Sequence, residues 1–237
     1  SLGLQSANED ELRFLGRAHS PQEVVQAVEN ARAAGFANIS LDLMLGLPGG
    51  SQEKLKKSIA FAASLEVEHI SSYILKVEPG TRLDDRVVRG EKLPDEDLQA
   101  DMYLWMVDRL SASGYRQYEI SNFARTGCQS RHNLKYWMGR PYLGFRPGAP
   151  SDVGGRRFSV RRDLDGCIAG GRGGGRVIDQ CDLIPQRERG SEYLMLRLRT
   201  TRGIEEWEYR REYFMNFDPI EQKLEEYERQ GWAQRHD

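Results

Sequence analysis

The sequence predicts an α/β fold: part of a parallel (β/α) barrel, followed by an α+β extension and a small, incomplete helical domain. Three strand-like segments alternate with helix-like segments in residues 1–75, which is typical of βα units in a parallel sheet. Three such units correspond to about half of a closed eight-stranded barrel. We therefore expect a half barrel over residues 1–125, an extension over 126–180 and a helical domain over 181–237.

The first βα unit begins with residues 1–6, where apolar residues alternate with small or polar ones as they do in a strand. A helical pattern follows over residues 9–17. Ser20 and Glu23 then form a capping box with Pro21 at the first helical position, so a second helix begins there.

The next two units repeat this order. Asn38–Leu45 is an apolar strand that runs into the glycine-rich turn Gly46–Gly50, and Ser51 caps a helix that continues to about Leu65. His69–Leu75 is the third strand. A long amphipathic helix then begins at Pro94 and ends at Gly114, and Tyr115–Ile120 is one more strand. The expected inward residues of this helix are Leu98, Met102, Trp105 and Val107.

The second half of the chain is less regular. Arg156–Val160 reads as a short strand, and the glycine-rich Cys167–Gly175 indicates a flexible connection. Helical patterns return from about Gln186, and the clearest are Gly203–Arg211 and Phe217–Gln230.

The composition excludes several classes of protein. Lys and Arg number 34 and Asp and Glu number 36, a net charge of −2, which gives no electrostatic footprint for nucleic acid. No apolar run approaches the roughly 20 residues of a membrane span. Cys128, Cys167 and Cys181 are few and widely spaced, which favours free thiols, a cytoplasmic location and no compact metal site.

Both ends of the chain look cut. The sequence begins with Ser1 rather than methionine, and its first residues already have a strand pattern. We expect a missing N-terminal half, without which the strand at residues 1–6 would be an unpaired parallel edge.

Polar residues near the carboxyl ends of predicted parallel strands are the first candidates for a ligand site. Asp42 lies inside an apolar strand, four residues before the glycine turn, and could accept a hydroxyl or an ammonium group. A structural polar contact is the alternative. Gln5 lies at the same rim and Arg17 at the end of the following helix. From the residues alone, structural roles are the better interpretation of these two.

His132, Tyr136 and Trp137 form a compact polar and aromatic cluster in an irregular region. An imidazole beside two aromatic rings could ligate heme iron or contact a flat macrocycle. On composition alone, a histidine bonded to local backbone, with aromatic core anchors beside it, is favoured.

Several motifs occur together in the order and spacing of one known family. They are GLQS (residues 3–6), LGR (15–17), DLMLGLPG (42–49), EPGT (78–81), YEISNFA (118–124) and H-N-x-x-Y-W (132–137). Through about Gly148 the chain resembles the radical S-adenosylmethionine family of oxygen-independent coproporphyrinogen III oxidases and the related HemW heme chaperones. The helices that follow look like that family's C-terminal domain, cut short.

This resemblance implies roles for individual residues. Gln5, Arg17 and Asp42 would contact S-adenosylmethionine, Asp42 through the ribose or aminoacyl group and Arg17 through the carboxylate. Lys76 would contribute a backbone contact to the same cofactor. His132, with Tyr136 and Trp137, becomes the leading heme contact.

The chain departs from the family pattern in two ways. It lacks the C-x-x-x-C-x-x-C motif that would hold a [4Fe–4S] cluster, so we expect the chain by itself to be inactive in radical chemistry. Residues 146–151 read RPGAPS where the HemW pattern is GPGAHS, so one histidine is lost. The cluster and S-adenosylmethionine are therefore cofactors expected of a full-length parent.

Three functions follow from these patterns. The leading hypothesis is part of a HemW-type chaperone that carries heme to acceptor proteins. The first alternative is an oxygen-independent coproporphyrinogen III oxidase, which acts on a porphyrinogen in heme biosynthesis. The second is a heme-binding module without a cluster. Expected partners are heme or porphyrinogen, heme-acceptor proteins and the missing N-terminal half.

Overall fold

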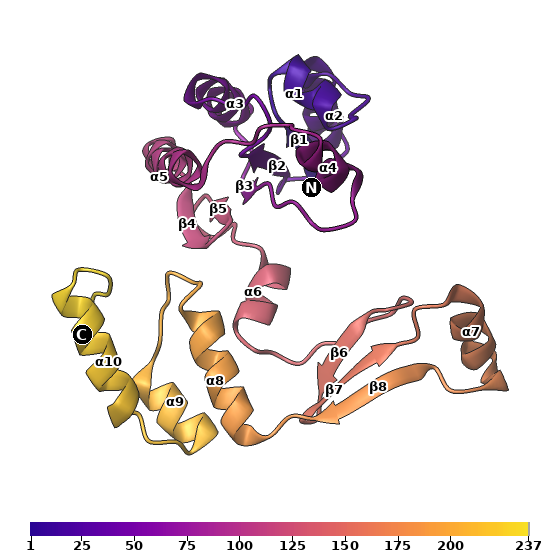
Figure 1. Cartoon of the computed structure of the whole chain (residues 1–237), viewed down its shortest axis with the longest axis vertical. Helices are drawn as coiled ribbons and strands as arrows, with labels where there is room; N and C mark the ends of the chain where they lie inside the picture. Colours follow the sequence, from indigo (N-terminus) through magenta and orange to yellow (C-terminus); the bar gives the residue numbers. More distant parts are fainter. Residues whose placement is uncertain (237) are drawn as a thin grey trace. The chain divides into compact units, whose positions relative to one another are not determined.

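The computed structural model describes residues 1–236 and divides the chain into two compact units (Figure 1). Unit 1 comprises residues 1–130, and unit 2 begins at Arg131. The expected half barrel ends close to this boundary. The expected extension and helical domain both belong to unit 2.

Unit 1 is built on a five-stranded mixed sheet of order β1-β2-β3-β5-β4. β1 pairs with β2 and β2 with β3 in parallel, whereas β5 pairs with β3 and β4 in antiparallel orientation. Among the described residues β1 pairs with β2 alone, in parallel orientation. The strands are β1 (Leu2–Gln5), β2 (Ser40–Leu45), β3 (His69–Ile74), β4 (Arg116–Glu119) and β5 (Asn122–Ala124).

Local capping signals place the helices of unit 1. The capping box is confirmed, because the Ser20 hydroxyl accepts from the Glu23 amide while the Glu23 carboxylate accepts from the Ser20 amide. Ser51 caps the next helix in the same way, by accepting from the Lys54 amide. The helices are α1 (Glu9–Phe14), α2 (Pro21–Ala33), α3 (Gln52–Ser64), α4 (Arg82–Val88) and α5 (Glu96–Ala112).

The core of unit 1 lies between the sheet and α2, α3 and α5, which Figure 1 shows along one side of the strands. Leu41, Leu43 and Leu45 alternate along β2 with less buried residues, so one face of this strand packs against the helices. Val24, Ile59 and Met106 cover them from α2, α3 and α5. The opposite face of β2 is left to Asp42 and its neighbours.

Three expectations for unit 1 are wrong in detail. In α5 the fully buried residues are Met102, Met106 and Leu110, whereas the expected inward Leu98 is exposed. Trp105 and Val107 are partly buried against the core. The segment after Gly114 is a hairpin of two short antiparallel strands rather than one strand. The polar helix α4 was not expected at all.

Unit 2 combines a three-stranded antiparallel sheet of order β6-β7-β8 with five α-helices and one π-helical turn. The glycine-rich connection expected at Cys167–Gly175 comprises the end of α7, which Asp163 caps through the Gly166 amide, and a π-helical turn in which Gly173 has a non-helical backbone. The elements are α6 (Arg131–Trp137), β6 (Pro150–Val153), β7 (Arg156–Val160), α7 (Leu164–Ala169), η1 (Gly170–Gly174), β8 (Ile178–Leu183), α8 (Gln186–Arg197), α9 (Glu206–Tyr213) and α10 (Asp218–Arg229).

The last three helices of unit 2 have an aromatic core of their own. Tyr193, Tyr209 and Phe217 are buried, and the rings of Tyr193 and Tyr209 lie 5.8 Å apart. Ion pairs from Asp152 to Arg189 and from Arg157 to Glu192 join the sheet to α8. In the part of the chain that the structure describes, no helix is long and apolar enough to span a membrane.

Candidate functional site

Asp42 lies on the face of β2 that points away from the helices. Its two carboxylate oxygens accept hydrogen bonds from the Ser1 hydroxyl at 2.9 and 2.8 Å. Its neighbours in the sheet are Gly3 on β1 and Ser71 on β3. The carboxylate therefore keeps acceptor capacity for hydroxyl or ammonium donors.

Gln5 folds back toward Asp42. The register of β1 shifts between Gly3 and Gln5, and Gln5 has a left-handed backbone with φ of 64°. Its Nε2 lies only 2.7 Å from where a Cβ on Gly3 would stand, so a side chain at position 3 would collide with the amide. Because Gly3 is the sheet partner of Asp42, the Gln5 amide and the Asp42 carboxylate are neighbours over adjacent strands.

Arg17 follows a Schellman turn at the end of α1. Its amide donates to the Leu12 carbonyl at 2.9 Å, and Gly16 takes a positive φ of 66°. His19 lies 3.4 Å from the Leu4 carbonyl, which holds this segment beside the end of β1. The Arg17 side chain is exposed, and none of the described carboxylates forms an ion pair with it. A free guanidinium of this kind suits a ligand carboxylate.

Lys76 follows the end of β3. Its ammonium pairs with Glu78 at 2.9 Å, and both side chains are largely exposed. The expected backbone contact at this position stays a prediction.

The chemistry of these residues fits S-adenosylmethionine. A carboxylate and an amide on adjacent strands match hydroxyl and ammonium groups, and a free guanidinium near the same rim matches a carboxylate. The described residues do not fit a [4Fe–4S] cluster. Their three cysteines are free, and no group of three His, Cys, Asp or Glu side chains among them could hold a metal ion.

A row of polar residues continues from Asp42 across the sheet. Paired positions lead from Asp42 to Ser71, then to Asn122 on β5 and Glu119 on β4. The Asn122 amide donates to Glu119, whose other oxygen accepts from the Ser121 amide at 3.1 Å. Burial raises the pKa of Glu119, against the opposing effect of the Ser121 hydrogen bond. We call these four residues the polar row.

Sequence reasoning missed the polar row as a unit. Its signal was the alternation of polar residues in Y-E-I-S-N-F-A, but the tight turn within that motif hides which residues share a face. Asn122 Oδ1 is buried with no partner among the described residues, so the row still has an unused acceptor.

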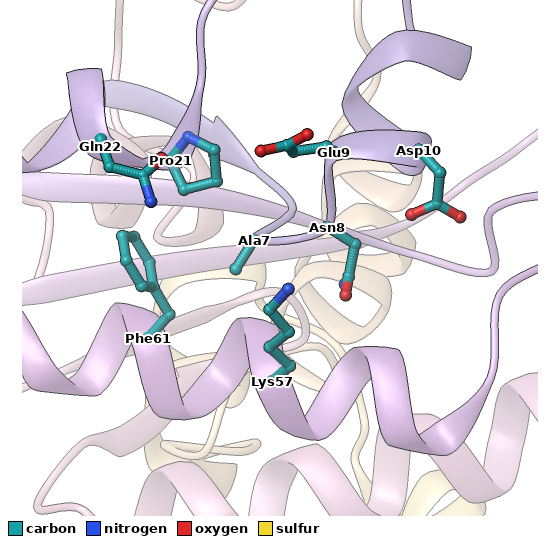
Figure 2. Close-up of a pocket in the computed structure, with 8 residues that line it drawn as sticks. All are labelled: Ala7, Asn8, Glu9, Asp10, Pro21, Gln22, Lys57 and Phe61. Carbon is teal, nitrogen blue, oxygen red and sulfur yellow. The ribbon is translucent and has the colours of Figure 1, made fainter.

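The hollow shown in Figure 2 lies elsewhere on unit 1. It measures about 340 Å³, and Lys57 and Phe61 point into it from α3 toward the loop of Ala7 and Asn8 (Figure 2). Neither Asp42 nor any other predicted cofactor contact lines it. Its lining mixes opposite charges around one aromatic ring, which does not specify a ligand class.

The second candidate site is helix α6 in unit 2. His132 is exposed, and its ring lies 5.0 Å from that of Tyr136 in an edge-to-face arrangement. Tyr136 is 37% exposed and Trp137 is half-buried, so neither is the buried core anchor of the alternative interpretation. An exposed imidazole next to an aromatic ring can contact a planar ligand or its metal.

Comparison with known proteins identifies a matching family, similar sequences and a similar fold. Residues 1–62 match the radical SAM superfamily. The heme chaperone HemW of Bacillus subtilis is 38% identical over 225 residues, which are 93% of this chain and 58% of that protein. HemW of Mycobacterium tuberculosis is 44% identical over 159 residues, 67% of this chain and 41% of that protein. The chain thus spans about half the length of the curated relatives it matches.

Among solved structures, the chain is similar to coproporphyrinogen III oxidase (HemN) from Escherichia coli, a radical SAM enzyme. The TM-score is 0.78 at 17% sequence identity, over 94% of this chain and 55% of that one. At this level of identity the likeness concerns the fold. The partial α/β fold predicted from the sequence is therefore confirmed.

Proposed function

Since the chain is a HemW- and HemN-like radical SAM protein, we propose that it belongs to a heme chaperone that binds heme and delivers it to acceptor proteins. The supporting observation is the exposed His132 beside Tyr136 on α6, in a chain whose similarity to proteins named heme chaperone HemW extends over 93% of its length. In this proposal His132 approaches heme iron, while Tyr136 and Trp137 contact the macrocycle. A cytoplasmic location is part of the same proposal.

We also propose that Gln5, Arg17 and Asp42 hold S-adenosylmethionine, with a backbone contact at Lys76. S-adenosylmethionine supplies radical chemistry in this superfamily. Asp42 would accept from ribose hydroxyls or the aminoacyl ammonium, and the neighbouring Gln5 amide would add a donor and an acceptor. Arg17 would pair with the aminoacyl carboxylate.

Heme titration of the purified chain tests the chaperone proposal. We expect a shifted Soret band on binding, and affinity lowered by about tenfold or more in His132→Ala, since a lost iron contact removes at least one strong interaction. His236→Ala, which removes another exposed histidine, should leave the titration unchanged. Absence of a shifted Soret band in the unaltered chain would contradict the proposal.

Coproporphyrinogen III oxidase activity is the second candidate, favoured by the structural likeness to HemN. The discriminating measurement is turnover of coproporphyrinogen by the full-length parent, supplied with iron, sulfide, reductant and S-adenosylmethionine, because this chain lacks the cluster cysteines. Turnover above background would favour the oxidase. Heme binding without turnover would favour the chaperone or a heme-binding module.

A further inference from the structure

The chain reverses direction directly after α6. Gly139 has a positive φ of 61°, its amide donates to the Tyr136 carbonyl at 2.9 Å, and the Arg140 amide donates to the Lys135 carbonyl at 2.9 Å. These two bonds form a Schellman motif, for which glycine is the favoured residue at the left-handed position. The turn returns the next residues alongside the helix they have just left.

Tyr142 is the residue that this turn places against α6. Its backbone exchanges two hydrogen bonds with Asp152 of β6, both 2.9 Å long, which fix its position. Its ring centroid lies 4.7 Å from that of Tyr136 at an interplanar angle of 72°. Because Tyr136 also contacts His132, three rings follow one another edge to face. We call His132, Tyr136 and Tyr142 the ring ladder.

The Tyr142 end of the ring ladder is an uncharged phenol. Burial raises the pKa of Tyr142, so its phenol stays protonated at neutral pH. Tyr142 therefore contributes ring surface and a hydroxyl rather than an anionic metal ligand. His132 and Tyr136 are exposed at the other end of the ladder.

A cation without an acidic partner lies at the same place. The Lys135 ammonium is 4.9 Å from the Tyr136 ring centroid, and within residues 1–236 no carboxylate forms an ion pair with it. Lys223 on α10 shows the contrast. It lies 5.1 Å from the Tyr227 ring in the same way, but it also pairs with Glu226 at 2.6 Å. The charge of Lys135 is thus available to an external anion.

We propose that Lys135 and Tyr142 complete a site for a planar macrocycle that carries carboxylates: Tyr142 extends the aromatic contact, and Lys135 pairs with one propionate. This inference rests on the proposed heme binding and adds two residues that the H-N-x-x-Y-W pattern does not specify. The apolar part of the macrocycle would contact the rings of Tyr136 and Tyr142, and His132 would remain the iron contact. Because Lys135 is half-buried and positively charged, it would bind a porphyrin with free carboxylates more tightly than the ester of that porphyrin.

Titrations of the full chain with heme and with heme dimethyl ester test the role of Lys135. We expect the unaltered chain to bind the diacid about tenfold more tightly than the ester, because only the diacid offers a charged partner. Lys135→Gln should remove this preference and leave ester affinity unchanged. Lys223→Gln is the matched control and should keep the preference.

Tyr142 is tested by two substitutions. Tyr142→Leu should weaken binding of the diacid and of the ester alike, by about tenfold, because a ring contact is lost for both. Tyr142→Phe keeps the ring and should bind as the unaltered chain does, as should the control Tyr227→Leu. Circular dichroism of each variant checks that unit 2 is folded.

The outcomes separate the two proposals. Absence of heme binding by the unaltered chain contradicts both. A second outcome is that heme binding weakens in His132→Ala but that Lys135→Gln still prefers the diacid to the ester. This outcome would support heme binding and overturn the role given to Lys135. Binding to both ligands that is unchanged in Tyr142→Leu overturns the part assigned to Tyr142.

Discussion

His69 shows how a single buried residue connects the sheet to its surroundings. Its Nδ1 lies 2.7 Å from the Ser40 hydroxyl and its Nε2 lies 2.8 Å from the Tyr118 hydroxyl, so both ring nitrogens are bonded. The side chain is almost completely buried. Burial lowers the pKa of His69, although the Asp42 carboxylate acts in the opposite direction.

This lowered pKa gives a prediction for the pH dependence of stability. The unfolded histidine has a pKa of about 6.5, so the unfolded chain takes up a proton before the folded one does. The contribution of His69 to the free energy of unfolding should therefore be complete above about pH 6.5. It should be lost as the pH falls from there through the pKa of His69 in the folded chain. Urea unfolding between pH 5 and 8 measures it. His69→Gln should flatten this slope, whereas a slope unchanged from that of the control His236→Gln would contradict the assignment.

At the same scale, sequence reasoning found some site residues and not others. Asp42 could be proposed from its position in an apolar strand, and Gln5 and Arg17 became candidates through the family resemblance. Glu119 and Tyr142 could not, because their roles depend on partners brought close by a hairpin and by a Schellman turn. Sequence spacing does not reveal such partners.

Among the elements, the contact between α8 and α9 depends on a buried ion pair. Arg197 Nη2 donates to both oxygens of Glu208, at 2.9 and 2.8 Å, and Tyr193 donates to the same carboxylate at 2.9 Å. The two side chains of the pair are 3% and 11% exposed. Removing one partner would leave a charge buried without compensation.

Glu208→Ala should therefore lower the free energy of unfolding of unit 2 by about 3–5 kcal/mol. Glu206→Ala is the matched control on the same helix, since its pair with Arg210 is exposed and should contribute no more than about 1 kcal/mol. Urea denaturation followed by circular dichroism measures both. Equal effects of the two substitutions would contradict the role given to the buried pair.

Elements with local signals were predictable, and elements fixed by tertiary pairing were not. α2 and α3 have capping serines, so both helices begin where the sequence predicts, and α3 ends within one residue of the expected Leu65. β5 has only three residues, and β6 and β8 are largely exposed, so none has the alternation that identifies a strand. The short helix α7, which Asp163 caps, precedes the glycine-rich segment and was not predicted.

On the scale of the whole molecule, the two units have separate cores. Leu43 belongs to the core of unit 1, and Tyr209 belongs to that of α8–α10. We expect urea unfolding to proceed in two transitions. Leu43→Ala should lower the free energy of unfolding of unit 1 by about 2–5 kcal/mol and shift the midpoint of its transition. Tyr209→Leu should shift the midpoint of the transition of unit 2. A single transition that both substitutions shift would show that the units unfold together.

The left-handed backbone of Gln5 has a consequence for how this position can evolve. A non-glycine residue in this conformation costs on the order of 1–3 kcal/mol, and Gln5 carries that cost while nearly buried. A glycine would hold the same turn without this strain, so glutamine is not the most stable residue for position 5. The strain that Gln5 retains is consistent with a functional role for its amide, as in the proposed contact with S-adenosylmethionine.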